Sequence, residues 1–204
     1  MFRQSLAPEA AYVDVAVHGD GLTSLQFRSD PGGPTREVQC PVIAPRRVRL
    51  AKRGDYVLLQ VASANGKLEP SGCSVRLPFS GKFHVGLAVC AHDNRAFETA
   101  VFSNVELEPG SAATTATTRT FAIETIPLSS LDRRVVFRST DKVESPHFSP
   151  DDSALYFNRN GRIHRLPLDA GAVPETIDTG FARKCSTTHA ISPDGTTLLF
   201  EDLT

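Results

Sequence analysis

Hydrophobic residues alternate with polar or small ones through most of the first 110 residues. The segments "YVDVAVHG" and "LTSLQFRS" both alternate in this way, and the tight-turn sequence Gly19-Asp20-Gly21 joins them. Two further pairs of segments follow the same scheme. The three pairs are 12–19 with 22–29, 46–54 with 55–63, and 82–92 with 98–108. Because alternate side chains of a strand face opposite ways, the pattern predicts three hairpins and no helical stripe. Such short strands favour an antiparallel sandwich or jelly roll.

The composition changes after residue 108. Residues 109–120, "PGSAATTATTRT", include no large apolar side chain and can contribute nothing to a core. We therefore assign 109–122 as a Thr/Ala-rich linker. It separates a first domain, 1–108, from a second, 123–204.

The second domain contains an internal repeat. "SPHFSPDDSALYFN" (145–158) and "THAISPDGTTLLFED" (188–202) align with a spacing of 43 residues, which also superimposes Phe157 on Phe200. The repeated motif consists of Ser149, Pro150, Asp151 and, in the second copy, Ser192, Pro193, Asp194, Gly195. Proline fixes φ, aspartate accepts hydrogen bonds from nearby amides and glycine tolerates positive φ, so each copy predicts a structural turn.

Between the two copies lie two more short strand candidates, 161–169 and 174–180, and another precedes them at 133–139. A period of roughly 40–45 residues with four strands is typical of a propeller blade. The second domain therefore predicts one full blade and about half of a second. A blade cannot bury both faces alone, so a neighbour has to stack on it.

Composition and charge limit the classes of partner and the cellular compartment that we expect for this chain. The chain has 204 residues, 22% of them charged, and a formal net charge of −1, which disfavours a nucleic-acid or anionic-membrane surface. No apolar run is long enough to span a bilayer, and the N-terminus lacks the pattern of a signal peptide. The four cysteines form no CxxC pair, so we expect them to be small buried side chains in a reducing compartment. This favours the cytoplasm, with the periplasm as the alternative if the natural chain begins further upstream.

The repeat resembles the opening blades of TolB-like propeller proteins, the biopolymer-transporter Tol group. "SPHFSPDDSALYFNRNGRIHRLPL" and "IDTGFARKCSTTHAISPDGTTLLF" carry its WD40-like (PD40) pattern around P-x-F-S-P-D-G. The similarity covers residues 123–204 and implies a β-propeller that binds a partner. Members of the group read Cys-Asn-Asn-Asp-His-Gly before the second motif, whereas this chain has Cys185-Ser186-Thr187-Thr188-His189-Ala190 and keeps only the cysteine and the histidine.

The upstream region resembles a concanavalin A-like jelly roll. "RQSLAPEAAYVDVAVHGDGLTSLQFR", "KRGDYVLLQVA" and "FHVGLAVCAHDNRAFETAVFSNVEL" carry this similarity. In such domains the Arg-Gln-Ser run follows several earlier strands, but here it begins at Arg3. Together with the end of the chain inside the second blade, this indicates a fragment of a longer protein. The predicted fold is all-β, with a partial jelly roll followed by the first one to two propeller blades.

No catalytic motif is present: the sequence has no G-x-S-x-G, no H-E-x-x-H and no glycine-rich phosphate loop. We assign no catalytic residue, metal ligand or cofactor. The candidate ligand residues are His189, Asp178 and His147, which a channel-facing site could use. The structural alternative is that His147 and His189, each just before a repeat turn, hydrogen-bond to a neighbouring blade.

The leading hypothesis is a non-catalytic binding or scaffold protein whose propeller face holds a protein or a small ligand. One alternative is a fragment of a propeller-containing hydrolase, peptidase-like or lactonase-like, with its catalytic part elsewhere. Another is a carbohydrate-binding jelly roll, although the chain has no tryptophan and few tyrosines for stacking on sugars. A further alternative is that residues 1–204 have no independent activity.

Overall fold

The computed structural model describes residues 1–62, 66–109 and 119–203. These residues form sixteen β-strands and no helix, so the all-β prediction is confirmed. The chain divides into two compact units, Met1–Thr117 and Thr118–Thr204, and each is described by itself. Most of the predicted linker, 109–122, lies outside the described residues, so the assignment of domains and linker stays a prediction.

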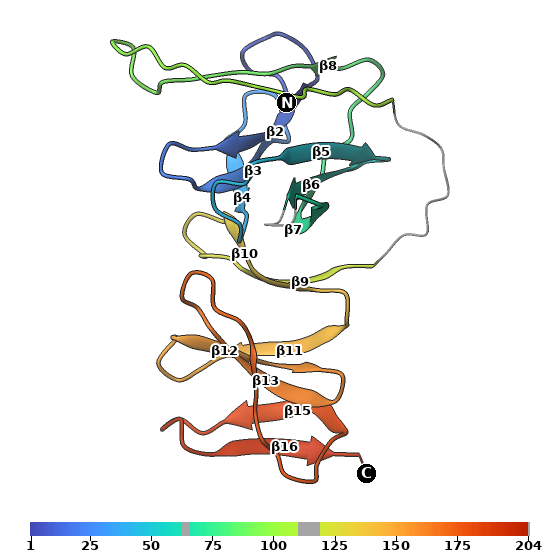
Figure 1. Ribbon diagram of the computed structural model, residues 1–204, viewed down its shortest axis with the longest axis vertical. Helices are drawn as coiled ribbons and strands as arrows, with labels where there is room; N and C mark the ends of the chain where they lie inside the picture. The colour runs from blue at the N-terminus through green and yellow to red at the C-terminus, as the bar shows by residue number, and fades with distance from the viewer. Residues whose placement is uncertain (63–65, 110–118, 204) are drawn as a thin grey trace. The chain divides into compact units, whose positions relative to one another are not determined.

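Unit 1 contains two antiparallel sheets. One has the order β8-β1-β2-β3-β4 and the other the order β5-β6-β7 (Figure 1). The strands are β1 (Phe2–Arg3), β2 (Tyr12–Val17), β3 (Thr23–Arg28), β4 (Arg36–Gln39), β5 (Val48–Arg53), β6 (Tyr56–Ala62), β7 (Leu68–Arg76) and β8 (His84–Val85). The first two predicted hairpins are therefore confirmed, as β2–β3 and β5–β6.

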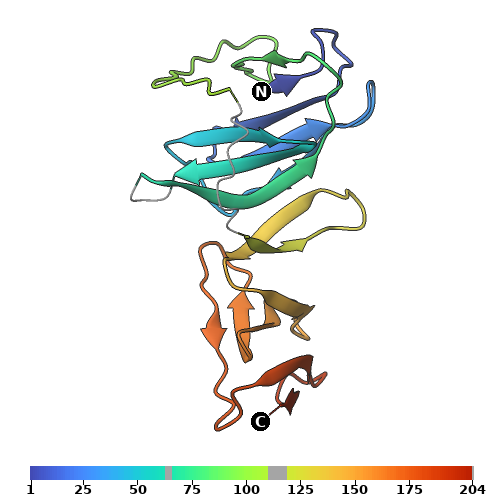
Figure 2. The same cartoon turned by 90° about the vertical axis from the view of Figure 1, so that its right-hand side faces the viewer.

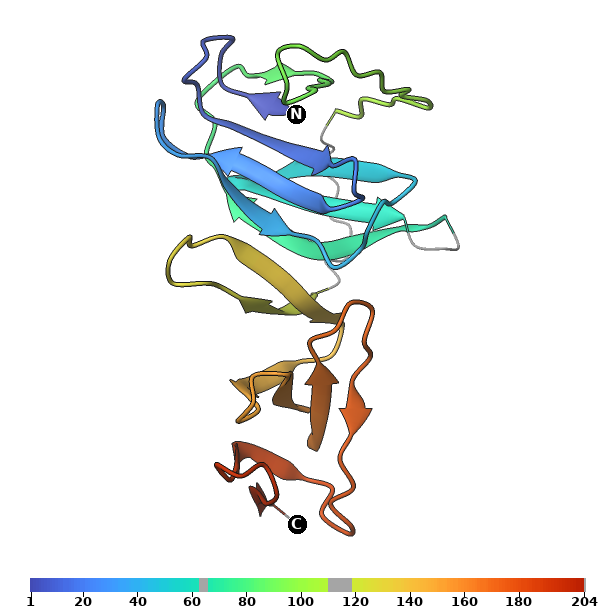
Figure 3. The same ribbon diagram turned by 90° about the vertical axis from the view of Figure 1, so that its left-hand side faces the viewer.

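The two sheets of unit 1 face each other as layers, which Figure 3 shows from the side. Alternating apolar residues fill the space between them, because one face of each strand points inward. Val13 and Leu25 from the first sheet and Val57, Leu59 and Val61 from the second are almost fully buried. Unit 1 is thus a β-sandwich, and its concanavalin A-like character stays a prediction.

The third predicted hairpin is wrong. Residues 82–92 contribute only the two-residue strand β8, and 98–108 form no strand. The apolar side chains of the second segment lie in solvent, with Val101 92% and Leu107 74% exposed. Alternation produces a strand only where a neighbouring strand completes the hydrogen-bond ladder and a core covers the apolar face, and the described residues provide neither here.

The cysteine prediction is confirmed for three of the four residues. Cys40, Cys73 and Cys185 are buried. Cys90 is exposed, because it lies in the segment that failed to form the third hairpin.

Unit 2 begins with a hairpin of β9 and β10, continues with a four-stranded antiparallel sheet in the order β11-β12-β13-β14, and ends with the pair β15-β16. The strands are β9 (Phe121–Thr125), β10 (Arg133–Ser139), β11 (Val143–Phe148), β12 (Ala154–Arg159), β13 (Arg162–Pro167), β14 (Glu175–Thr176), β15 (Cys185–Ile191) and β16 (Leu198–Asp202). The four-strand period predicted from the repeat is confirmed. Figure 2 shows β15 and β16, in red, beside one end of the four-stranded sheet.

Two apolar clusters hold unit 2 together. Leu155, Phe157 and Leu166 pack with Ile123 of β9 on one side of the four-stranded sheet. Ile163 packs on the other side with Ala182 and Cys185, and Phe200 is partly buried against this cluster. β12 and β13 are therefore covered on both faces, once by the β9–β10 hairpin and once by the second repeat.

The two repeats have the same register. In the first, Phe148 lies opposite Leu155, and in the second, 43 residues later, Ile191 lies opposite Leu198. Each hairpin also has an irregularity before its turn, between Glu144 and His147 in one and between Cys185 and His189 in the other. The repeat in the sequence thus corresponds to a repeat in the backbone.

Candidate functional site

The first repeat turn is built by one serine and one aspartate. Ser149 Oγ donates to Asp151 Oδ1 at 2.6 Å and accepts a hydrogen bond from the amide of Ala154 at 2.9 Å. The same Asp151 oxygen accepts from both the amide and the hydroxyl of Ser153, at 3.1 and 2.8 Å. Asp152 supplies the left-handed residue of the turn, with φ of 57°. Local polar bonds thus close the link between β11 and β12.

The second turn repeats this network atom for atom. Ser192 Oγ donates to Asp194 Oδ1 at 2.5 Å and accepts from the amide of Thr197 at 2.9 Å. Thr196 donates to the same carboxylate oxygen through its amide and its hydroxyl, at 3.0 and 2.8 Å. Gly195, with φ of 73°, stands where the first copy has Asp152. The motif residues form the turns that the sequence predicted.

These bonds keep both aspartates ionised. The hydroxyl of Ser149, followed by the hydroxyl and amide of Ser153, lowers the pKa of Asp151 to about 2. The hydroxyl of Ser192, followed by the amide and hydroxyl of Thr196, lowers the pKa of Asp194 to about 2 in the same way. A carboxyl group with so low a pKa is a fixed negative charge near neutral pH and a poor general acid or base.

Both turns line one hollow of ≈ 530 Å³, together with Tyr156 and Arg165. The turns come close together here: a Cβ added to Gly195 would lie 4.0 Å from Cγ of Pro150. The guanidinium of Arg165 and the hydroxyl of Tyr156 make no hydrogen bond or ion pair within the described residues. The hollow therefore offers two fixed carboxylates, one unpaired cation and one phenol.

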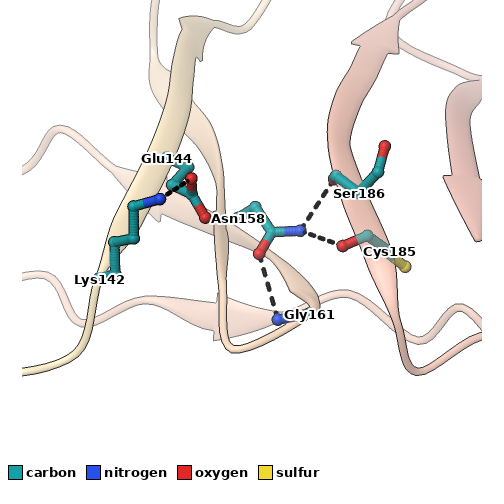
Figure 4. Close-up of polar contacts among 6 residues, drawn as sticks. All are labelled: Lys142, Glu144, Asn158, Gly161, Cys185 and Ser186. Carbon is teal, nitrogen blue, oxygen red and sulfur yellow. Dashed lines mark hydrogen bonds and ion pairs between the residues drawn. The ribbon is translucent and has the colours of Figure 1, made fainter. Parts of the chain in front are cut away.

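A buried amide joins the two repeats (Figure 4). Asn158, 3% exposed, donates to the carbonyl oxygens of Cys185 at 2.8 Å and Ser186 at 3.0 Å. Its own side-chain oxygen accepts from the amide of Gly161 at 3.2 Å. The amide of Cys185 in turn donates to the Gly161 carbonyl at 3.0 Å. We call Asn158, Gly161, Cys185 and Ser186 the amide anchor.

The anchor requires a tight turn between β12 and β13. Asn160 and Gly161 have φ of 54° and 70°, as expected for a two-residue hairpin loop of the Asn-Gly type. A Cβ on Gly161 would lie 2.9 Å from the carbonyl oxygen of Arg183, closer than real side chains come. Glycine is thus needed both for the turn and for the approach of the segment before β15.

The two histidines named from the sequence come together. The rings of His147 and His189 lie 4.8 Å apart between centroids, with 52° between their planes, and His147 also stacks on Tyr156 at 5.8 Å. Nε2 of His147 and both ring nitrogens of His189 are buried and make no hydrogen bond. Burial, and after it the nearby His147, lowers the pKa of His189.

Asp178 does not join the histidines. It is exposed in the loop between β14 and β15, where its carboxylate accepts from the amide of Gly180 at 2.9 Å. Nor do the described residues hold any group of three or more His, Cys, Asp or Glu placed to bind a metal ion. In the same part of the chain no helix has the length and apolar character of a membrane span.

Four residues of this region were missed by the sequence analysis: Asn158, Gly161, Tyr156 and Arg165. The dipeptide Asn160-Gly161 was an available signal, because Asn-Gly between alternating segments is a strong hairpin indicator. Tyr156 and Arg165 carry no such signal. They reach the hollow only because β12 and β13 pair side by side, with Tyr156 directly opposite Arg165.

Comparison with known proteins identifies one related stretch. Over 81 residues the chain is 38% identical to an uncharacterised protein of Agrobacterium fabrum, a match that covers 40% of this chain and 28% of that protein. The chain thus spans less than a third of the curated relative that it matches. No protein-family model matches the sequence.

Two solved structures are similar in part. A protein described as "putative TolB" from Agrobacterium tumefaciens is 37% identical over 43% of this chain and 31% of its own, with a TM-score of 0.40. One described as a "putative 6-phosphogluconolactonase" from Bacteroides uniformis is 18% identical over 92% of this chain and 60% of its own, with a TM-score of 0.28. Both TM-scores are too low to show a shared fold.

Proposed function

We propose that the chain is a non-catalytic binding protein of the TolB-like propeller group, and that its ligand, a protein segment or a small molecule, occupies the hollow between the two repeat turns. The observation that carries this proposal is the pairing of two equivalent turns around one hollow that also contains an unpaired arginine. A volume of ≈ 530 Å³ suits a small ligand or a few residues of a peptide.

The electrostatics favour binding over hydrolysis. The carboxylates of Asp151 and Asp194 are held ionised by their own turns, so neither is poised to exchange a proton near neutral pH. Their fixed negative charges would attract a cationic group. Arg165, which has no ion-pair or hydrogen-bond partner among the residues that the structure describes, would hold a carboxylate or a phosphate in fork geometry. A peptide that carries both signs of charge therefore suits the hollow best.

The test is a titration of the ¹⁵N-labelled chain with a panel of short peptides that combine a basic and an acidic side chain. We expect amide shifts at the residues that line the hollow. Arg165→Met should weaken binding without unfolding the chain, because this side chain makes no polar contact to lose. Arg183→Met, which removes an exposed arginine of the same unit outside the hollow, is the matched control.

Two parallel measurements distinguish the alternatives. Oligosaccharides that shift unit 1 and leave the hollow unchanged would favour a carbohydrate-binding jelly roll. Turnover of chromogenic esters or lactones by the purified chain would favour an enzyme. Peptide affinities that are equal for the wild type and for Arg165→Met would overturn the assignment of the hollow.

A further inference from the structure

The two repeats of unit 2 contact each other at two places that differ in chemistry. At one, the amide anchor joins Asn158 of the first repeat to the start of β15 through neutral hydrogen bonds. At the other, His147 of β11 meets His189 near the end of β15, with 4.8 Å between ring centroids. The first contact does not titrate in the physiological range. The second consists of two imidazole rings, and imidazole is the side chain whose charge changes most readily near neutral pH.

The histidine contact disfavours a charge on His189. Both ring nitrogens of His189, and Nε2 of His147, are buried and make no hydrogen bond among the described residues, so a proton on His189 would place a charge where it is shielded from water. The backbone of Thr187 and Tyr156 lies near the ring of His189 and favours its charged form slightly. Burial and the neighbouring imidazole act in the opposite direction and are the larger effects.

The strands around the pair supply no counter-charge. On β12, Tyr156 stacks on His147, and on β16 the residue in register with His189 is Phe200. Among the causes of the lowered pKa of His189, the neighbouring His147 follows burial.

The carboxylates of the adjoining elements have partners of their own. Glu144 on β11 pairs with Lys142, Glu124 on β9 pairs with Arg133 at 3.0 Å, and Asp202 on β16 accepts from the amide of Lys184. Glu201 and Arg159 are the other charged residues of β16 and β12.

We propose that His147 and His189 form an acid-sensitive latch between the two repeats: closed while the ring of His189 is neutral, it opens when that ring is protonated and releases the end of β15 from β11 while the amide anchor keeps the start of β15 attached. Because Tyr156 both stacks on His147 and lines the hollow, opening the latch changes the hollow as well. The latch would thereby make the shape of the hollow depend on pH. Its test requires no ligand.

The direction of the effect follows from the shift at His189. Its pKa is lowered in the closed latch and returns to an ordinary value near 6.5 once the ring is in water. The closed latch therefore has its full stability above about pH 6.5 and loses it as the pH falls below that value toward the lowered pKa. For each pKa unit that separates the lowered pKa of His189 in the closed latch from its ordinary pKa in water, acid raises the equilibrium constant for opening about tenfold.

Hydrogen–deuterium exchange of the whole chain at about pH 7.5 and about pH 5.5, corrected for the intrinsic exchange rates, tests the latch. We expect the end of β15, residues 188–191, to lose protection in acid, while β12, β13 and the anchored start of β15 keep theirs. His189→Gln and His147→Gln, which cannot take up a proton, should each reduce the difference between the two pH values. His84→Gln, at an exposed histidine of unit 1, should leave it unchanged.

A second histidine of unit 2 provides the decisive control. His164 is buried, and burial also lowers its pKa, but it lies on β13 against Phe157, away from the latch. If His164→Gln abolishes the acid response, or if His189→Gln retains it in full, the latch is wrong. Should a glutamine variant fail to fold, NMR titration of the wild-type rings decides: a pKa of His189 that is not lowered from the ordinary value for histidine would overturn the proposal.

Discussion

Replacing Asn158 by alanine removes a side chain that makes three hydrogen bonds, two of which link the two repeats. Two are donated to the carbonyl oxygens of Cys185 and Ser186, and one is accepted from the amide of Gly161. Since the site is buried, water does not replace the lost partner until β15 separates from the first repeat. At a net value of about 0.5–1.5 kcal/mol for each bond, the unit should lose about 2–4 kcal/mol of unfolding free energy.

Urea unfolding followed by two-dimensional NMR measures this loss, because the amide signals of unit 2 are observed separately from those of unit 1. For a domain of this size the same change lowers the melting temperature by roughly 10–25 °C. Asn158→Asp sharpens the test. Its ionised carboxylate can still accept from Gly161 but faces two carbonyl oxygens, so it should destabilise at least as much as alanine at neutral pH.

Asn94→Ala, at an exposed loop position, is the control and should change stability by less than about 0.5 kcal/mol. If Asn158→Ala also cost less than that, the amide anchor would not be what joins the repeats. Wild-type stability in Asn158→Asp would equally contradict the donor role assigned to the amide.

Three further predictions concern the turns of unit 2. Because the pKa of Asp194 is lowered to about 2, the contribution of its carboxylate to stability is complete above about pH 4 and is lost as the pH falls toward 2. Asp194→Asn should therefore make stability, measured from unfolding curves by circular dichroism, depend less on pH in this acid range. At Asp152, where φ is 57°, valine should cost about 1–2 kcal/mol in urea unfolding and glycine nothing; equal stability of the two variants would refute the strain argument. Gly161→Ala should cost at least about 1 kcal/mol, since the new Cβ meets the Arg183 carbonyl at 2.9 Å and φ is 70°; an unchanged melting temperature would contradict this.

The strands that the sequence predicted correctly are those with a partner close by along the chain. Tyr12–Val17 and Thr23–Arg28 alternate cleanly around a glycine-containing turn, and pairing across that turn follows from local pattern alone. The segment 98–108 alternates just as well and forms no strand. Its failure could not be foreseen, because a strand also needs a free edge and a covered face, and both are provided by distant residues.

The sequence likewise predicted the repeat turns. A serine, a proline and an aspartate in that order favour a turn closed by their own side chains, and both copies adopt it. The sequence did not predict that the two turns lie close together. Nothing in either motif indicates that Pro150 and Gly195 lie side by side or that Arg165 enters the same hollow.

By itself the sequence determined the all-β character, the 43-residue repeat and the chemistry of its turns, because these depend on side-chain period and on hydrogen bonds between residues a few positions apart. The stacking of one repeat on the other was decided by tertiary structure alone. It buried Asn158 against the carbonyls of Cys185 and Ser186 and brought His147 to His189 across the same contact. These pairings depend on how two sheets pack, which side-chain period and local hydrogen bonds do not specify.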